Sequence, residues 1–233
     1  MPEVDPMDTT DGTTLHAALR AENASVRLRA ALAAGTRPDR DLLETLVQRC
    51  AVEPDFFVRD MLSWALTRLP AEVTLPRIRR ELAAEDARAR AQALHSLSKI
   101  GDGRAWPWIT GDLLRDPDDE VARTAWRVAV ALAPDGAERG LAEELVTQLG
   151  RGDREVQRSL SRALVELGDA AETALAEAAR CPDPMVATHA RATDRLRHDP
   201  EAGFDAAVDE AKRLVALGPE RAAAVEATEA GRC

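Results

Sequence analysis

Few residues in this chain have types and spacings that could support metal chemistry. The four histidines form no HExxH motif and no pair four residues apart, the spacing that places two imidazoles on one face of a helix for zinc. The three cysteines form no CxxC pair, so neither a zinc cage nor a disulfide framework is expected. We therefore predict no metal site and no cofactor. These residues are His16, His95, His189 and His198, with Cys50, Cys181 and Cys233.

Signatures of enzymatic chemistry are equally scarce. The sequence holds no GxSxG nucleophile turn, no GxxxxGK[ST] phosphate loop and no GxGxxG dinucleotide motif. Its carboxylates are abundant, but runs such as Asp118-Asp119-Glu120 and Glu143-Glu144 lie where helix capping or solvation accounts for them. The sequence therefore predicts a protein that is not an enzyme.

One row of side chains has the chemistry of binding. Cationic groups along one surface can pair with carboxylates, and an indole at such a surface is a typical hot spot for a protein partner. Arginines on a solvated helix face are also routine, because their stems cover apolar surface while their charges stay in water. The row is therefore either a binding surface or an ordinary exposed face. The candidate partner-binding residues are Trp64, Arg68, His95, Lys99, Arg123, Arg127, Arg158 and Arg162.

An internal repeat supplies the elements that must position this row. Six similar segments begin 32, 31, 32, 35 and 30 residues apart, a period typical of stacked two-helix units. Each follows acidic or turn-forming residues, such as Pro54-Asp55 and Pro182-Asp183-Pro184, which can accept hydrogen bonds from free amides at a helix start. The segments begin at Val26, Val58, Ala89, Val121, Val156 and Val186.

The helical period of each segment separates a core side from an outer side. Residues 4, 8 and 11 positions after the first are mostly small or apolar, so they face the core, whereas positions 2, 6 and 9 or 10 carry the candidate row. Shorter amphipathic stretches between the segments supply a first helix for each pair. Gly35, Gly101 and Gly168 follow second helices as expected left-handed caps.

The composition agrees with an all-helical chain. Of 233 residues, 45% are hydrophobic, mostly Ala, Leu and Val, and 3% are aromatic, which disfavours a β-sandwich. The net charge of −10 should repel nucleic acid and anionic lipid. No segment approaches the roughly 20 apolar residues of a membrane span, and the N-terminus has no leader, so we expect a cytoplasmic protein with no membrane partner.

We predict an all-α fold, an α-solenoid (superhelix) of about six helical hairpins with a C-terminal capping helix near residues 204–217. Residues 1–12 are expected to be a disordered N-terminus, residues 13–217 the repeat domain and residues 218–233 a flexible tail, because both ends have little to bury. Trp106, Trp108 and Trp126 are expected to pack within or between hairpins.

The repeat resembles a known family. Its VR pairs near the start of the second helix and its LGD-like turns (KIGDGRAW, ELGDAAETAL) are similar to HEAT or HEAT-like repeats, including the phycobilin-lyase type of bacteria. The fourth to sixth repeat segments depart from the pattern, because Ala122, Gln157 and Ala187 replace the arginine that follows the first aligned residue. The resemblance implies stacked hairpins whose second helices line a concave groove. It also implies a chromophore-handling protein as one possible function.

Two local resemblances suggest other functions. Residues 54–70, PDFFVRDMLSWALTRLP, resemble a DNA-binding helix of the HEAT-like alkylpurine DNA glycosylases, with matches at Phe56, Phe57, Arg59, Trp64 and Arg68. The Trp-Asp pair of that family has no match, since the nearest acid after the paired tryptophans is at the wrong spacing. The same segment resembles the repeats fused behind mercury-resistance-type helix-turn-helix regulators, which implies a stand-alone binding part whose partner is a transcription regulator or another protein.

We hypothesise a non-enzymatic HEAT-repeat scaffold or adaptor that binds a protein, or an acidic segment of one, in its concave groove. Trp64 would be the apolar anchor, and the cations of the row would pair with acidic groups. A regulatory role belongs to this hypothesis. The alternative is a HEAT-like DNA-binding protein or alkylbase DNA glycosylase, which the net charge disfavours.

Overall fold

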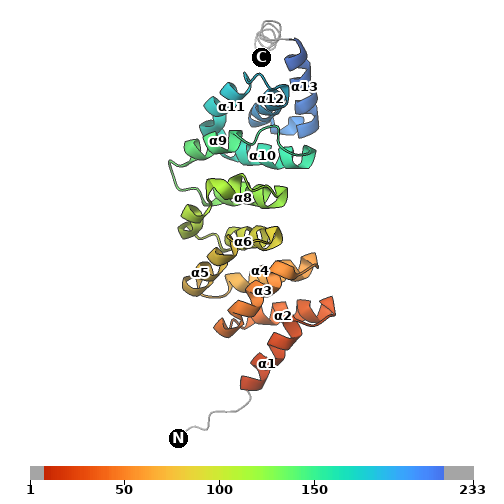
Figure 1. The fold of residues 1–233 in the computed structure, drawn as a ribbon, viewed down its shortest axis with the longest axis vertical. Helices are drawn as coiled ribbons and strands as arrows, with labels where there is room; N and C mark the ends of the chain where they lie inside the picture. The colour runs from red at the N-terminus through yellow and green to blue at the C-terminus, as the bar shows by residue number, and fades with distance from the viewer. Residues whose placement is uncertain (1–7, 218–233) are drawn as a thin grey trace. The chain divides into compact units, whose positions relative to one another are not determined.

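The chain is helical throughout the range that the structure describes. The computed structural model describes residues 8–217, and every regular element in that range is an α-helix or a short 3-10 helix (Figure 1). The prediction of an all-α helical repeat is therefore confirmed. Each second helix begins two residues before the aligned Val or Ala of its segment: α2 (Ala24–Thr36), α4 (Phe56–Thr67), α6 (Ala87–Ile100), α8 (Asp119–Leu132), α10 (Arg154–Glu166) and α12 (Pro184–His198).

The first helices are shorter and less regular. Hairpins form where α1 packs on α2, α3 on α4, α5 on α6, α9 on α10 and α11 on α12. Before α8, the 3-10 helix η2 (Gly103–Trp108) and the short α7 (Gly111–Leu114) replace a regular helix, because Pro107 has no amide hydrogen to continue one. The first helices are α1 (Asp8–Leu19), α3 (Leu43–Val52), α5 (Ala71–Glu81), α9 (Glu138–Val146) and α11 (Glu172–Ala178), with η1 (Arg40–Leu42) and η3 (Gly168–Ala171) before α3 and α11.

The ends of the chain complete the order of elements. After α12, η4 (Pro200–Ala202) leads into α13 (Phe204–Leu217), the helix predicted at the open end, and α13 packs on α12. α1 begins at Asp8, inside the range 1–12 that the sequence assigned to a disordered terminus. The rest of that range, residues 1–7, and the predicted tail, residues 218–233, lie outside the described residues.

Polar side chains cap the N-termini of the second helices, as the sequence predicts. Asp55 accepts a hydrogen bond from the amide of Val58 at 3.0 Å, and Asp153 accepts from the amides of Glu155 and Val156. Each cap satisfies amides that have no partner within the first turn of the helix. Asn23, Asp86 and Asp183 cap α2, α6 and α12 in the same way.

In the first three repeat segments, the arginine after the aligned Val or Ala clamps the turn before its helix. The guanidinium of Arg59 donates to the carbonyls of Glu53 and Pro54 at 2.8 and 2.7 Å. Arg27 and Arg90 make the same pair of bonds five and six residues upstream. Because a guanidinium satisfies two carbonyls at once, this residue fixes the angle at which the chain enters the helix.

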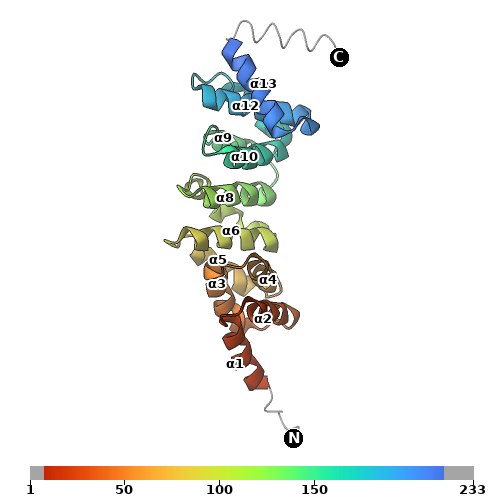
Figure 2. The same cartoon turned by 90° about the vertical axis from the view of Figure 1, so that its right-hand side faces the viewer.

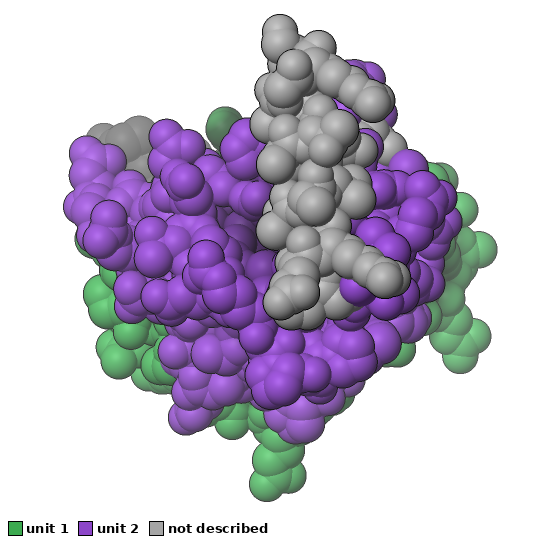
Figure 3. All heavy atoms as spheres, turned by 90° about the horizontal axis from the view of Figure 1, so that it is seen from above, with its two compact units in different colours: residues 1–110, 120–132 green, residues 111–119, 133–233 purple. Residues whose placement is uncertain are grey.

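The chain divides into two compact units, which Figure 3 shows in different colours. Unit 1 is residues 1–110 and 120–132, and unit 2 is residues 111–119 and 133–233. In unit 1, α2, α4 and α6 lie side by side (Figures 1 and 2), and in unit 2, α10 packs on α12. Unit 1 has 17 Lys and Arg against 17 Asp and Glu, and unit 2 has 14 against 24. The whole net charge of −10 therefore belongs to unit 2.

The core positions inferred from the repeat are buried, but one glycine was misassigned. Leu62, Leu66, Leu160 and Leu164 are at most 1% exposed. Gly101 and Gly168 have positive φ angles of 68° and 57°, as predicted for left-handed caps. Gly35 is instead a buried residue of α2 without a positive φ, so that prediction was wrong. Gly35 is needed because it has no side chain, which leaves room for the ring of Trp64.

Candidate functional site

Six of the eight predicted binding residues lie in unit 1, on α6 and α8 and on or at the end of α4. His95 of α6 is half-buried, and its imidazole is within electrostatic range of Lys99, Arg127 and Asp60. Burial lowers the pKa of His95, and the neighbouring cations Lys99 and Arg127 lower it further. Side chains from three helices, Asp60, Lys99 and Arg127, therefore lie around His95. We call these four residues, together with Trp64 and Arg123 at the other predicted outward positions of α4 and α8, the cationic face.

The charges of the cationic face are partly satisfied within the chain. The ammonium of Lys99 lies 3.2 Å from a carboxylate oxygen of Asp60, and the guanidinium of Arg123 lies 3.5 Å from Glu120. The exposed Arg127 donates only within α8, to the carbonyl of Arg123 and the hydroxyl of Thr124. Exposed pairs of this kind are weak and exchange readily with a stronger acidic partner. The face therefore retains an excess of positive charge.

Trp64 is half-buried rather than freely exposed. A β-carbon built at Gly35 would come within 2.2 Å of the Trp64 ring, so the indole of α4 occupies the space beside the bare backbone of α2. This contact holds the ring in one position. The sequence placed Trp64 on the outer side without showing that α2 supports it. A supported aromatic ring loses little conformational entropy on binding, which suits an anchor.

Two more aromatic side chains lie at the start of α4. Phe56 and Phe57 are 65% and 69% exposed, with their rings edge to face at 5.6 Å between centroids. Phe57, Met61, Trp64 and Arg68 follow one another at helical spacing, so they form one side of α4, with Arg68 exposed at its end. The sequence analysis named the two phenylalanines only as matches to DNA glycosylases. Their place just before the first core residue of the segment was the signal that they face outward.

The two predicted binding residues of unit 2 differ from each other. Arg158 of α10 is already engaged, since its guanidinium lies 3.2 Å from Asp205 and 5.7 Å from the ring centroid of Phe204, both on α13. Arg162, one turn further along α10, is exposed. The sequence showed that both point away from the core. It did not show that α13 covers one of them.

The match to DNA glycosylases is weakened at Arg59. Its guanidinium is bound to the carbonyls of the preceding turn and is only partly exposed, so it belongs to the clamp of α4. Trp126, by contrast, is fully buried in α8, and Trp108 lies under the guanidinium of Arg79 at 5.1 Å. Both are packing residues, as expected.

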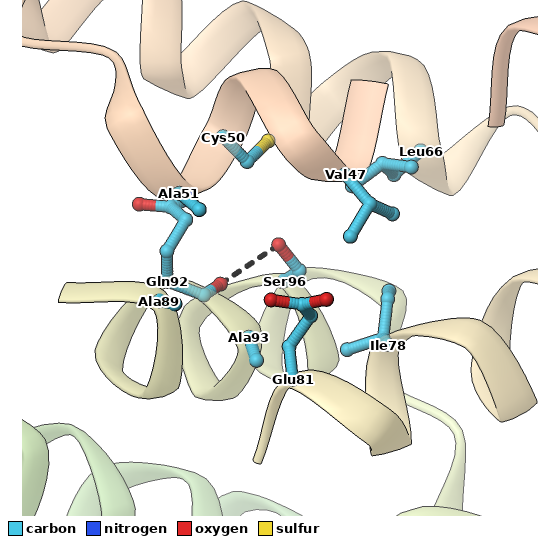
Figure 4. Close-up of a pocket in the computed structure, with 10 residues that line it drawn as sticks. All are labelled: Val47, Cys50, Ala51, Leu66, Ile78, Glu81, Ala89, Gln92, Ala93 and Ser96. Atoms are coloured by element: carbon cyan, nitrogen blue, oxygen red, sulfur yellow. Dashed lines mark hydrogen bonds between the residues drawn. The ribbon is translucent and has the colours of Figure 1, made fainter. Parts of the chain in front are cut away.

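A small pocket lies among α3, α4, α5 and α6 (Figure 4). Cys50, Glu81, Gln92 and Ser96 are among its lining residues, and Figure 4 shows the hydrogen bond from the Ser96 hydroxyl to the Gln92 carbonyl. Burial raises the pKa of Cys50 to about 12, so its thiol stays protonated at neutral pH and is a poor nucleophile. The carboxylate of Glu81 is paired with Arg77 at 2.7 Å. The pocket is therefore part of the packing of unit 1.

A serine and a histidine meet in the core of unit 2. His189 Nε2 lies 3.0 Å from both the Ser161 hydroxyl and the Gln157 carbonyl, and the Gly150 amide donates to His189 Nδ1 at 3.0 Å. Because Nδ1 accepts, the proton of the neutral ring must be on Nε2. That nitrogen cannot take a proton from Ser161, so the pair does not have the arrangement of a nucleophile and its base. It joins α10 to α12.

The described part of the chain contains neither a metal-binding cluster nor a membrane-spanning helix. Within residues 8–217, no three or more His, Cys, Asp or Glu side chains are grouped so that they could hold a metal ion. Over the same residues, no helix has the length and apolar character needed to cross a membrane.

These features define a helical-repeat protein with a mixed aromatic and cationic surface. No protein-family model and no curated protein matches the sequence. Among solved structures, an engineered protein is similar with 21% identity, a TM-score of 0.45 and coverage of 86% of this chain and 97% of that chain. The complex of CpcE and CpcF of phycocyanin lyase from Nostoc sp. PCC7120 is similar with 18% identity, a TM-score of 0.33 and coverage of 91% and 95%.

One prediction must be corrected in view of these comparisons. The sequence analysis excluded an enzyme because it found no catalytic motif in a chain of helical hairpins. One finding overturns the exclusion: a solved structure to which this chain is similar is titled as that of a phycocyanin lyase. The firm exclusion was therefore wrong.

Proposed function

We propose that this chain is a helical-repeat scaffold that binds an acidic segment of another protein on the cationic face of unit 1. The observation that carries the proposal is the group of charged side chains around half-buried His95, where Lys99 of α6 lies 3.2 Å from Asp60 of α4 and Arg127 of α8 is exposed. Cations from separate helices at one surface can engage successive carboxylates of an extended or helical segment. A transcription regulator as the partner and a cytoplasmic location stay predictions.

The aromatic side of α4 gives the proposed surface its anchors. Phe57 and Trp64 lie on the same side of α4, and Trp64 is held by α2 through Gly35. Aromatic anchors surrounded by charged groups are typical of hot spots at protein interfaces. Unit 1 has no net charge, so unit 1 itself does not repel an acidic partner as a whole. We expect the partner segment to combine acidic with large apolar residues.

Selection from a random peptide library tests the chemistry of the partner. The full chain is immobilised, a phage-displayed library of peptides of about 16 residues is panned against it, and enriched peptides are synthesised with a fluorophore for anisotropy titration. We expect enrichment of Asp and Glu together with aromatic or aliphatic residues. Enrichment of basic or purely apolar sequences would contradict the proposal.

Charge reversal tests the location. In the variant Lys99→Glu/Arg127→Glu, the loss of two exposed pairs, each worth up to about 1 kcal/mol, should weaken peptide binding about tenfold or more. The matched control is Arg40→Glu/Arg80→Glu, which makes the same change of charge at exposed positions of η1 and α5. Equal weakening by both variants would show that only overall charge matters.

DNA is the second candidate partner, and the charge distribution of the chain allows it at unit 1. The net charge that disfavours nucleic acid belongs to unit 2, whereas unit 1 is neutral and exposes Phe56 and Phe57. Against it, Arg59 is committed to the turn before α4. Titration of intact and alkylated duplexes at low salt, with base release measured in parallel, decides between the candidates. Binding of duplex that weakens steeply with salt and is lost in Lys99→Glu/Arg127→Glu would favour DNA over an acidic segment.

A further inference from the structure

The last helix, α13, is docked on α12 in unit 2 through an apolar contact. Phe204 is 7% exposed and packs edge to face against the ring of His189, with 6.1 Å between centroids. The other buried residues of α13 are Ala207, Val208 and Ala211, so Phe204 is the one large buried side chain among the described residues of this helix. The apolar cluster consists of Ala192, Phe204, Ala207, Val208 and Ala211, with Leu196 packed against it.

Ion pairs surround this contact. Asp205 lies 3.4 Å from Arg154 and 3.2 Å from Arg158, and Asp209 lies 3.7 Å from Arg154. All four side chains are between 40% and 68% exposed. Exposed pairs are weak because water and salt screen them. They therefore orient α13 on α10 more than they hold it there.

The connection to α13 is short and includes a conformation that favours glycine. Five residues separate the end of α12 at His198 from the start of α13 at Phe204, and Pro200 begins η4 within them. Gly203 has φ 70° and ψ 145°, a combination that side-chain-bearing residues rarely adopt. Short connections with such requirements favour the exchange of a terminal element between copies, because the open form removes them.

We propose that α13 is an exchangeable latch, and that its seat on α10 and α12 also accepts the α13 of a second copy of this chain. The seat consists of Arg154, Arg158, His189, Ala192 and Leu196. The second copy is the occupant because its helix carries the Phe204, Asp205 and Asp209 that this seat already fits. An exchanged dimer needs no new contact, since each seat regains the one it lost. The pairs of the seat also offset locally the repulsion between two units of charge −10.

A complementary charge reversal tests the exchange. The latch variant is Asp205→Arg/Asp209→Arg and the seat variant is Arg154→Asp/Arg158→Asp, each in the full chain. Alone, each variant repels its own α13, so hydrogen exchange in α13 should become faster while the chain stays monomeric. Mixed in equal amounts, the two should form a dimer of one chain of each kind, measured by light scattering after size exclusion, since each latch then fits only the other chain's seat.

Charge reversals at exposed positions outside the seat serve as controls for the latch and seat variants. The control pair is Glu166→Arg/Glu177→Arg with Arg139→Asp/Arg180→Asp, which reverses the same number of exposed charges in unit 2 at positions outside the seat, and its mixture should stay monomeric. A monomeric mixture of the latch and seat variants would overturn the proposal. So would unchanged hydrogen exchange in α13 of the single variants, because the pairs would then not orient the latch. Dimers in the control mixture would show charge attraction only and would also overturn it.

A substitution at Gly203, in the connection between α12 and α13, tests the exchange of α13 while the contacts between α13 and its seat are unchanged. Gly203→Ala strains the closed connection but not the open one, so the dimer fraction at high protein concentration should rise several-fold above that of the wild type. Gly140→Ala is the control, because Gly140 lies in α9 with open space around it and no positive φ. A Gly203→Ala protein that stays as monomeric as the control at every concentration would refute the exchange.

Discussion

His189 should make the stability of unit 2 depend on pH in mildly acidic solution. The side chain is 2% exposed, and its Nδ1 accepts a hydrogen bond from the Gly150 amide. A proton added to Nδ1 would face that amide hydrogen with no acceptor available. Burial lowers the pKa of His189 from 6.5 to about 4, although the hydrogen bond to the Gln157 carbonyl opposes the shift. The perturbation to apply is acidification from pH 8 to pH 5.

The sign and size of the effect follow from the two pKa values. The unfolded chain takes up the proton near pH 6.5, whereas the folded chain resists it until about pH 4. The stabilisation is therefore complete above pH 6.5 and is lost as the pH falls toward 4. At pH 5 the unfolded imidazole is almost fully protonated and the folded one is mostly neutral, which corresponds to a loss of about 2 kcal/mol. The full loss, reached below pH 4, is about 3 kcal/mol.

Urea unfolding followed by circular dichroism measures this loss. The variant His189→Gln removes the titrating group, so its free energy of unfolding should fall by about 2 kcal/mol less than that of the wild type between pH 8 and pH 5. His198→Gln is the control, since His198 is exposed at the end of α12. Both variants retain His95, whose contribution therefore cancels. Hydrogen-bonded Glu44 and Glu53, with pKa values lowered to about 2, stay ionised at pH 5.

The reasoning would be refuted by equal pH dependence of the wild type and His189→Gln. That result would mean that the buried ring takes up a proton in the folded chain as easily as in the unfolded chain. A titration of the His189 ring carbons by nuclear magnetic resonance gives an independent check, because the ring signals should stay those of neutral imidazole down to about pH 5.

Three further substitutions test the packing of unit 1 by urea unfolding. Glu53→Gln leaves two guanidinium groups beside a neutral side chain that is 0% exposed, and it should cost about 3–5 kcal/mol; a cost below about 1 kcal/mol would contradict the buried pair. Gly35→Ala should cost about 1–3 kcal/mol and shift the emission of Trp64, and an unchanged spectrum would count against their contact. Arg90→Ala should cost about 1.5–3 kcal/mol through the clamp, whereas the exposed Arg88→Ala should stay within about 0.5 kcal/mol.

The elements of the fold could be predicted because their signals are local. An Asp such as Asp55 caps a helix through residues three positions away, and the leucines of one helix face recur with the helical period. These signals need no knowledge of the rest of the chain. They fail before α8, where Pro107 interrupts the first helix, and at Gly35, whose sequence position after a helical segment looks the same as that of Gly101.

The site could be predicted only in part. The repeat shows which side chains point away from the core of their own hairpin, but it does not show which other helices they contact. Arg127 and Arg162 are exposed as the repeat suggests, but Arg158 at the neighbouring outer position is paired with Asp205 of α13. His189 lies on a helix that the repeat also predicted, but its pKa is lowered because other segments, among them those of Gly150 and Gln157, pack around the ring and bury it. Such partners lie about 30 to 40 residues away in sequence, beyond the reach of a pattern within one helix.

The fourth and fifth repeat segments lack the arginine that clamps the turn before the helix, and other side chains bind the carbonyls of that turn instead. Where Ala122 replaces the arginine, the carbonyl six residues upstream, that of Asp116, accepts a hydrogen bond from Arg151 at 2.5 Å. Arg151 also pairs with Asp119 at 2.8 Å. Where Gln157 replaces the arginine, its amide reaches the Gly152 carbonyl at 3.3 Å. The requirement therefore belongs to the carbonyls of the turn, which need a donor, and the repeat position of that donor can change without loss of the turn.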